Sequence, residues 1–221
     1  MKASDLFVRC LEAEGVERIF GVPGEENADF MISLIDSKID FVLCRHEQGA
    51  AFAADAHGRL TGKAGVCLGT LGPGVTNLLT GIADANMDRA PVVAIIGQGS
   101  TKRQHKESHQ IMDAIGMCKP ISKWAQSVLA SENITEIVRK AFKVAETEKP
   151  GLCVIELPED VAREEIDDTP IPPTKARRPG ADQRFRSSCP DRSPTRVLVL
   201  PGLKCDAADR PSRLCRGGHR R

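Results

Sequence analysis

Aromatic residues are scarce in this chain, which has no tyrosine and an aromatic content of only 4%. This composition argues against the stacked aromatic platforms that bind single-stranded nucleic acids. A net charge of +1 gives no electrostatic reason to expect a nucleic acid or a membrane surface as partner. Apolar runs such as Pro91 to Ile96 are far too short to span a bilayer, and the N-terminus lacks the apolar core of a signal peptide. We therefore expect no nucleic-acid partner and no membrane partner.

Paired cysteines are also missing, because none of the eight cysteines falls in a Cys-x-x-Cys motif. This absence argues against a zinc site, and the spacing does not suggest a disulfide framework. Several cysteines lie within apolar, strand-like runs, where they would act as small buried hydrophobic residues. Such usage is typical of a protein in the reducing cytoplasm.

Short apolar runs alternate with helical patterns over residues 1–160. Strands are expected at 18–22, 40–44, 64–70, 91–96 and 151–157. Helices are expected at 3–14, 25–37, 47–61, 75–87 and 132–147, the last with a capping box over Asn133–Glu136. Strands that are apolar on both faces indicate a parallel sheet covered on both sides. The sequence thus predicts a doubly wound, flavodoxin-like α/β domain over residues 1–165, built from five or six βα units.

In doubly wound sheets, ligands bind at the carboxyl ends of the strands. The loops at 22–26, 44–48, 70–77 and 97–110 are therefore the places to look for a site.

The C-terminal part of the chain has a different character. Residues 166–183 are predicted to be a proline-rich linker, and residues 184–221 contain nine arginines and three cysteines. This tail could be a disordered basic segment or a nucleic-acid-binding arm. We favour a third interpretation, a shift of the reading frame near Gln183, because a GC-rich gene read out of frame encodes such a composition.

Glu47 directly follows the apolar run Phe41–Cys44 and is the first candidate for chemistry. A carboxyl group there is poorly solvated and can share or donate a proton near neutral pH. The alternative is a glutamate in the first turn of a helix, favoured there by the helix dipole. A zinc-protease helix does not fit, because residue 50 is alanine where a second histidine is needed.

The glycine-rich stretch Gly69 to Asn77 is the second candidate. Its amides could cradle an anion at a helix N-terminus, although glycines also serve tight turns and close packing. His105 and His109 are four residues apart, but without a third ligand they do not predict a metal site.

Taken together, five segments resemble the N-terminal pyrimidine-binding domain of thiamine diphosphate enzymes, most of all the large subunit of acetolactate synthase. The resemblance covers about residues 1–180, and the segments occur in the family's order. They are Gly21–Asn27, Arg45–Gln48, Gly58–Gly62, Gly69–Asn77 and Asp88–Val92.

The resemblance implies roles for individual residues. Glu47 corresponds to the glutamate that hydrogen-bonds N1′ of the cofactor's aminopyrimidine and so promotes loss of the C2 proton. The residues implied to lie at the cofactor are Pro23, Gly24, Thr70, Gly72, Pro73 and Asn77. Gln110 resembles a glutamine that reaches the neighbouring subunit's active-site region. His109 before it resembles family members that need no flavin, which argues against FAD dependence.

The family's other half-site is not found in this sequence. The resemblance implies that Mg²⁺ and the diphosphate are held by a Gly-Asp-Gly motif in a C-terminal domain, and no Gly-Asp-Gly occurs here. We therefore expect an N-terminal fragment of a homodimeric or tetrameric enzyme that acts on 2-keto acids such as pyruvate, inactive by itself. The alternatives are another decarboxylase or carboligase of the family, a non-catalytic stand-alone domain or pseudogene product, and, more weakly, a flavodoxin-like nucleotide binder.

Overall fold

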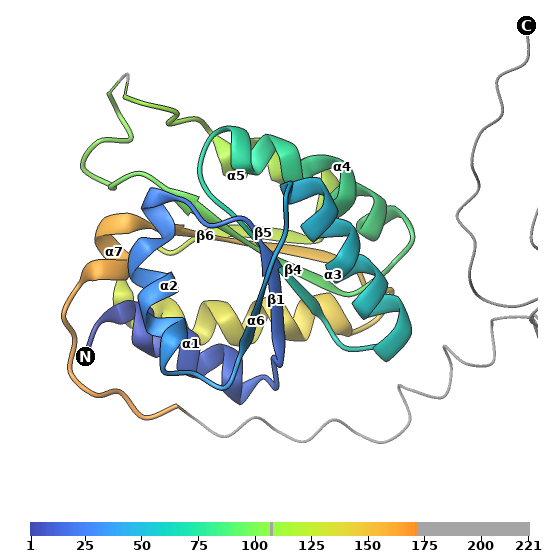
Figure 1. Ribbon diagram of the computed structural model, residues 1–221, viewed down its shortest axis with the longest axis horizontal. Helices are drawn as coiled ribbons and strands as arrows, with labels where there is room; N and C mark the ends of the chain where they lie inside the picture. Colours follow the sequence, from blue (N-terminus) through green and yellow to red (C-terminus); the bar gives the residue numbers. More distant parts are fainter. Residues whose placement is uncertain (107, 172–221) are drawn as a thin grey trace, which may run out of the picture. The chain divides into compact units, whose positions relative to one another are not determined.

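The computed structural model describes residues 1–106 and 108–171. This part of the chain forms one six-stranded parallel sheet with helices on both faces (Figure 1). The strands are β1 (Arg18–Gly21), β2 (Asp40–Leu43), β3 (Gly65–Gly69), β4 (Val92–Gln98), β5 (Trp124–Ser127) and β6 (Leu152–Pro158). The α-helices are α1 (Ala3–Ala13), α2 (Ala28–Ile35), α3 (Glu47–Thr61), α4 (Pro73–Met87), α5 (Ala114–Cys118), α6 (Ile134–Glu146) and α7 (Glu159–Arg163). The predicted doubly wound α/β fold is confirmed.

The helices form two layers, each with its own hydrophobic core. Helices α1, α2, α6 and α7 cover one face, and α3, α4 and α5 cover the other (Figure 1). The apolar periodicity of α6 explains its orientation, because the apolar residues spaced three and four apart along it are all buried. These residues are Ile134, Ile137, Val138, Ala141, Phe142 and Ala145. None of the helices in the described part of the chain has the length and apolar character needed to cross a membrane.

The strand order β2-β1-β3-β4-β6-β5 creates a switch point between β1 and β3. From β1 the chain moves outward to β2, and it then returns to place β3 on the other side of β1. The loops that follow β1 and β3 therefore leave the sheet on opposite sides of one crevice at its carboxyl edge. Ligands bind at such points in doubly wound sheets.

Some local predictions were wrong or incomplete. Strand β5 and helix α7 were missed because both are short and one is a half-exposed edge strand. The capping box at Asn133 is not formed: a 3-10 turn (Ser131–Asn133) precedes α6, so Asn133 already has helical backbone angles. A cap needs an extended backbone at that position.

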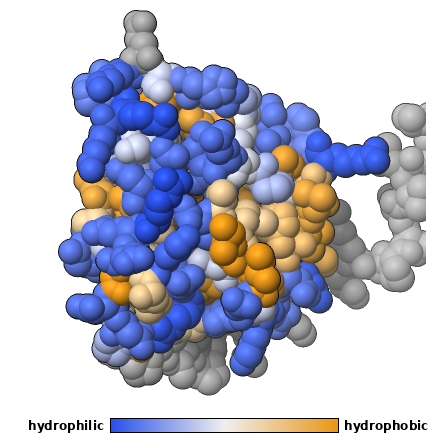
Figure 2. Space-filling view, turned by 60° about the vertical axis from the view of Figure 1, so that its left-hand side comes forward, coloured by the Kyte–Doolittle hydropathy of each residue, from blue (hydrophilic) through white to orange (hydrophobic). Residues whose placement is uncertain are grey.

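Edge strand β2 is an exception to the expectation that the strands are covered on both faces. Leu43 is 70% exposed, and Val42 is also exposed. Figure 2 shows apolar residues gathered over one part of the surface that it draws, next to a largely hydrophilic remainder.

The five described cysteines are free thiols, and four of them are buried. Burial raises the pKa of Cys67 and Cys153 to about 12, so these thiols stay protonated and behave as small apolar residues. The predicted linker over 166–183 lies outside the described residues except for 166–171, and the predicted tail over 184–221 lies wholly outside them.

Candidate functional site

The loops that follow β1 and β3 meet at the switch point. A Cβ atom on Gly24 would stand 2.4 Å from the Thr70 Cβ, so a glycine is needed for the two loops to approach so closely. Thr70 Oγ1 donates a hydrogen bond to Glu26 Oε2 at 3.0 Å. Pro23 precedes Gly24 in the same loop and is exposed.

Glu47 is the first residue of α3, directly beyond the carboxyl end of β2. Its side chain is buried, with the residue only 8% exposed. Asn77 Nδ2 on α4 donates a hydrogen bond to Glu47 Oε2 at 2.9 Å. Within the described residues, no hydrogen bond reaches the second oxygen, Oε1, which lies 3.6 Å from the point where a Cβ on Gly74 would stand. The carboxyl group is thus fixed by one oxygen, while the other faces a residue without a side chain.

The glycine-rich turn connects β3 to α4. Gly72 has φ 57°, in the left-handed region that favours glycine, and exposed Pro73 begins α4. The amides of Gly74 and Thr76 donate to the carbonyls of Leu71 and Gly72. Since these amides are used inside the turn, the turn is better suited to close approach than to cradling an anion.

Gln110 arrives at this turn from the segment that follows β4. A Cβ on Gly72 would stand 2.8 Å from the Gln110 Cβ, which shows how closely the two residues lie. Gln110 is exposed and has φ 56°, a conformation that costs a residue with a side chain on the order of 1 kcal/mol.

The structure therefore gathers the residues singled out from the sequence at one edge of the sheet. Direct contacts join Glu47 to Asn77, Gly24 to Thr70, and Gly72 to Gln110. Glu26 and Gly74 have no distinguishing signal of their own in the sequence, although both lie within the segments that carry the family resemblance. The roles of all these residues at a cofactor remain predictions.

His105 and His109 do not form a metal centre with other residues in the described part of the chain. Both histidines lie in turns, so they do not share the face of a helix that a four-residue spacing would allow. Over residues 1–106 and 108–171, no group of three or more His, Cys, Asp or Glu side chains is placed to hold a metal ion.

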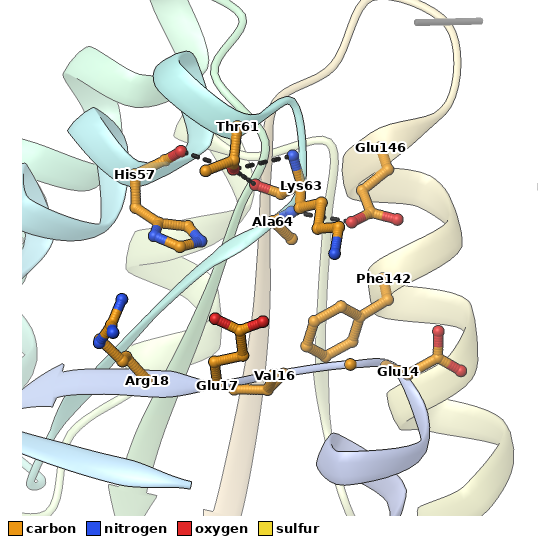
Figure 3. Close-up of a pocket in the computed structure, with 11 residues that line it drawn as sticks. Glu14, Val16, Glu17, Arg18, His57, Thr61, Lys63, Ala64, Phe142 and Glu146 are labelled. Atoms are coloured by element: carbon orange, nitrogen blue, oxygen red, sulfur yellow. Dashed lines mark hydrogen bonds between the residues drawn. The ribbon is translucent and has the colours of Figure 1, made fainter. Parts of the chain in front are cut away.

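A separate hollow lies at the opposite edge of the sheet, where β1 and β3 begin (Figure 3). Acidic Glu17 and Glu146 line it together with basic Arg18 and Lys63. His57 also lines it, and burial together with the charge of Arg18 lowers the His57 pKa. None of the predicted site residues borders this hollow, so it is separate from the carboxyl-edge site.

Comparisons with known proteins agree with this geometry. The family model described as "Thiamine pyrophosphate enzyme, N-terminal TPP binding domain" matches residues 1–117, more than half of the chain. The probable acetolactate synthase large subunit of Methanocaldococcus jannaschii is 46% identical over 181 residues, which are 81% of this chain and 31% of that protein.

Two further relatives have similar names. The catabolic acetolactate synthase of Raoultella terrigena is 43% identical over 178 residues, which are 80% of this chain and 32% of that protein. The acetolactate synthase isozyme 2 large subunit of Escherichia coli is 41% identical over 161 residues, 73% of this chain and 29% of that protein. The chain thus spans about a third of the length of the relatives it matches.

Proposed function

The chain belongs to the thiamine pyrophosphate enzymes and contains their N-terminal TPP-binding domain, and from this premise we propose that it supplies the pyrimidine-binding half of a thiamine diphosphate site. By analogy with its acetolactate synthase relatives, the reaction is the decarboxylation of a 2-keto acid such as pyruvate and its joining to a second 2-keto acid. With two molecules of pyruvate the product is 2-acetolactate.

The geometry of Glu47 carries this proposal. Its Oε2 is held by Asn77, and its Oε1 accepts no hydrogen bond from the described residues and lies close to Gly74, so that oxygen is available to a ligand. A buried carboxyl group with one oxygen available can hold a proton at a ring nitrogen of an aminopyrimidine. These residues fit the cofactor, which when bound supplies the electron sink for decarboxylation.

The neighbouring residues support the same role. Asn77 fixes the orientation of the Glu47 carboxyl group, and Gly24 and Thr70 bring the β1 and β3 loops together beside it. By the resemblance, Gln110 would reach the substrate region of the active site shared with a neighbouring subunit. The His109-Gln110 pair is the reason that we do not include FAD in the proposed site.

The diphosphate and its Mg²⁺ need a second set of residues. The sequence has no Gly-Asp-Gly motif, and within the described residues no side-chain cluster is suited to a metal ion. We therefore place that half of the site outside the described residues. The free thiols agree with action in the cytoplasm.

A second subunit would cover exposed apolar residues on α3 and α4. Leu60 is 86% exposed and Met87 is 73% exposed, and Phe52 on α3 is also exposed. Exposed apolar groups of this kind mark interaction surfaces, so we expect the chain to self-associate as a dimer or tetramer. Light scattering of the purified chain checks this expectation, and replacement of Leu60 and Met87 by aspartate should shift the chain toward the monomer. A wild-type chain that is cleanly monomeric contradicts it.

The main test reconstitutes the site. The full chain is mixed with thiamine diphosphate, Mg²⁺, pyruvate and a separately produced C-terminal part of an acetolactate synthase, and acetolactate is measured. Loss of the C2 proton of the cofactor is followed by proton–deuterium exchange in NMR. We expect both activities only when the partner is present, and Glu47→Gln should slow C2 exchange about 100-fold or more.

Glu17→Gln is the matched control, since Glu17 is exposed at the opposite edge of the sheet. It should leave the exchange rate unchanged. Unchanged exchange in Glu47→Gln removes Glu47 from its proposed role, and activity of the chain alone contradicts the half-site. Exchange without acetolactate formation favours another decarboxylase or carboligase of the family, and no exchange at all favours a non-catalytic domain.

A further inference from the structure

The segment between Gly99 and Met112 carries Gln110, and a single side chain ties its two ends together. Gln98, the last residue of β4, accepts a hydrogen bond at Oε1 from the amide of Gly99, over 3.0 Å. Its Nε2 donates to the carbonyl oxygen of Met112, also over 3.0 Å. One amide group thus contacts the first and the last turn of the segment.

Glu156 on β6 holds this amide in place. Gln98 Nε2 uses its second hydrogen to bond Glu156 Oε1 at 3.0 Å. Gln98 is 3% exposed and Glu156 is 4% exposed, so water does not replace these contacts. A buried glutamine with both of its N–H donors and its oxygen used is a rigid connection, and losing one partner leaves a buried polar group unsatisfied.

Other contacts fix the start of the segment to helix α7, at a distance along the chain from Gln110. Asp160 on α7 accepts hydrogen bonds from the hydroxyl groups of Ser100 and Thr101. Arg103 forms an exposed ion pair with Glu159. The far end of the segment is held near the start by Gln98 and by Ile111, whose side chain packs where a Cβ on Gly99 would stand.

Gln110 needs such support because its left-handed backbone is strained. Strained residues persist only where the surrounding structure determines their conformation. Met112, which Gln98 binds, follows Gln110 by two residues, and Gly72 lies against the other side of Gln110.

We propose that Gln98, oriented by Glu156, is a positioning residue that joins the two ends of the 99–112 segment and so holds Gln110 against the glycine turn next to Glu47. The importance of this position for catalysis rests on the proposed function. The claim that Gln98 holds the segment together does not rest on it, because these hydrogen bonds form in the chain without a cofactor.

Hydrogen exchange of the full chain, resolved by peptide in mass spectrometry, tests whether Gln98 holds the segment together. Gln98→Leu keeps the bulk of the side chain but removes its hydrogen bonds, and amides in the 100–112 segment should exchange about tenfold faster. Glu156→Leu should act in the same way. Glu156→Gln should resemble the wild type, because a glutamine oxygen can still accept the bond from Gln98.

Gln126→Leu is the matched control, since Gln126 is an exposed glutamine on edge strand β5. It should leave the exchange rates of amides in the 100–112 segment unchanged. If Gln98→Leu does not fold, Gln98→Asn gives the same test, because its side chain is one methylene shorter and cannot reach both ends of the segment. The proposal is overturned if amide hydrogen exchange over residues 100–112 is the same in Gln98→Leu as in the wild type. It is also overturned if amides in β3 and β6 accelerate equally, because the variant has then loosened the whole sheet.

The reconstituted enzyme separates this proposal from the proposed function. There, Gln98→Leu and Glu156→Leu should raise the KM for the 2-keto acid several-fold, and Glu156→Gln should restore it. Faster local exchange with unchanged kinetics keeps the connection but contradicts the role given to Gln110. Unchanged local exchange contradicts the connection whatever the kinetics show.

Discussion

At the carboxyl edge of the sheet, Asn77 donates to Glu47 over 2.9 Å and Gln98 donates to Glu156 over 3.0 Å. Both carboxyl groups are buried, and each is held by a side-chain amide from a neighbouring element. Their surroundings differ. Glu47 begins a helix beyond the edge strand β2, with one oxygen facing a glycine, whereas Glu156 lies in interior strand β6 and binds an amide that also binds two backbone groups.

The comparison shows that burial and an amide partner do not identify a catalytic carboxyl group. Burial raises the pKa of Glu156, a property often taken as a sign of function, yet its partner Gln98 serves the backbone of a loop. Glu47 is distinguished instead by its second oxygen, to which no described residue donates a hydrogen bond. A chemical role needs a place for the reacting molecule as well as a suitable proton donor.

The largest predicted effect comes from replacing glutamate by glutamine in each of the two carboxyl–amide pairs, Glu47–Asn77 and Glu156–Gln98. In the reconstituted enzyme, Glu47→Gln should slow C2 exchange about 100-fold or more, because an amide cannot hold the proton that a carboxyl group holds. Glu156→Gln should change the rate less than about threefold, because an amide oxygen still accepts the bond from Gln98. NMR exchange measurements on both variants check this contrast. Equal effects mean that the two carboxyl groups are not functionally different.

A smaller effect is predicted for the contact between Gly72 and Gln110, which joins the glycine turn after β3 to the segment after β4. Gly72→Ala places a Cβ 2.8 Å from the Gln110 Cβ at a residue with φ 57°. The strain and the overlap together should lower the free energy of unfolding by about 2 kcal/mol. Urea denaturation of the full chain measures this change.

The control for Gly72→Ala is Gly49→Ala. Gly49 lies within α3, and a Cβ there would have no atom within 4 Å. This substitution should stabilise the chain by up to about 1 kcal/mol, because alanine is the better helix former. A similar loss of stability in both variants would mean that the contact between Gly72 and Gln110 is not responsible.

Elements with strong local signals could be predicted from the sequence. The helix over 47–61 has the predicted bounds, because an apolar strand precedes it and Gly62, with φ 70°, ends it. The loops expected to surround a site do lie at one edge, which follows from parallel strands alone. Strand β5 was missed because Trp124–Ser127 is short and largely polar, and as an edge strand it needs only one covered side.

The link between Gln98 and Glu156 could not be predicted in the same way. The two residues are 58 positions apart, and nothing in the sequence near either one indicates the other. Their contact depends on β4 and β6 being neighbours, although β5 lies between them along the chain. Glu47 and Asn77 are also distant in sequence, but the family resemblance named both of them. Physical contacts between distant residues were therefore predicted only where a known pattern supplied them.

The smallest predicted effect concerns pH, and it separates Glu156 from an ordinary glutamate. Burial raises the Glu156 pKa above its usual 4.5 and outweighs the polar contacts with Ser127 and Gln98, which lower it, while the Asp113 charge raises it further. Cys118 also lies close to the carboxyl group and adds no positive charge. Because the folded chain holds this proton more tightly than the unfolded chain, the stabilisation is complete below pH 4.5 and is lost as pH rises through the folded-state pKa.

Glu156→Gln removes this dependence, since glutamine does not ionise. Urea denaturation at several pH values between 5 and 8 should therefore show the variant gaining stability relative to the wild type as pH rises. Glu132→Gln, at an exposed position, should show the same dependence of unfolding free energy on pH as the wild type. A constant difference between Glu156→Gln and the wild type would show that Glu156 is ionised in the folded chain even at pH 5. The carboxyl group that positions the loop would then be as charged as any at the surface, and its burial would have to be offset by contacts beyond those of Gln98.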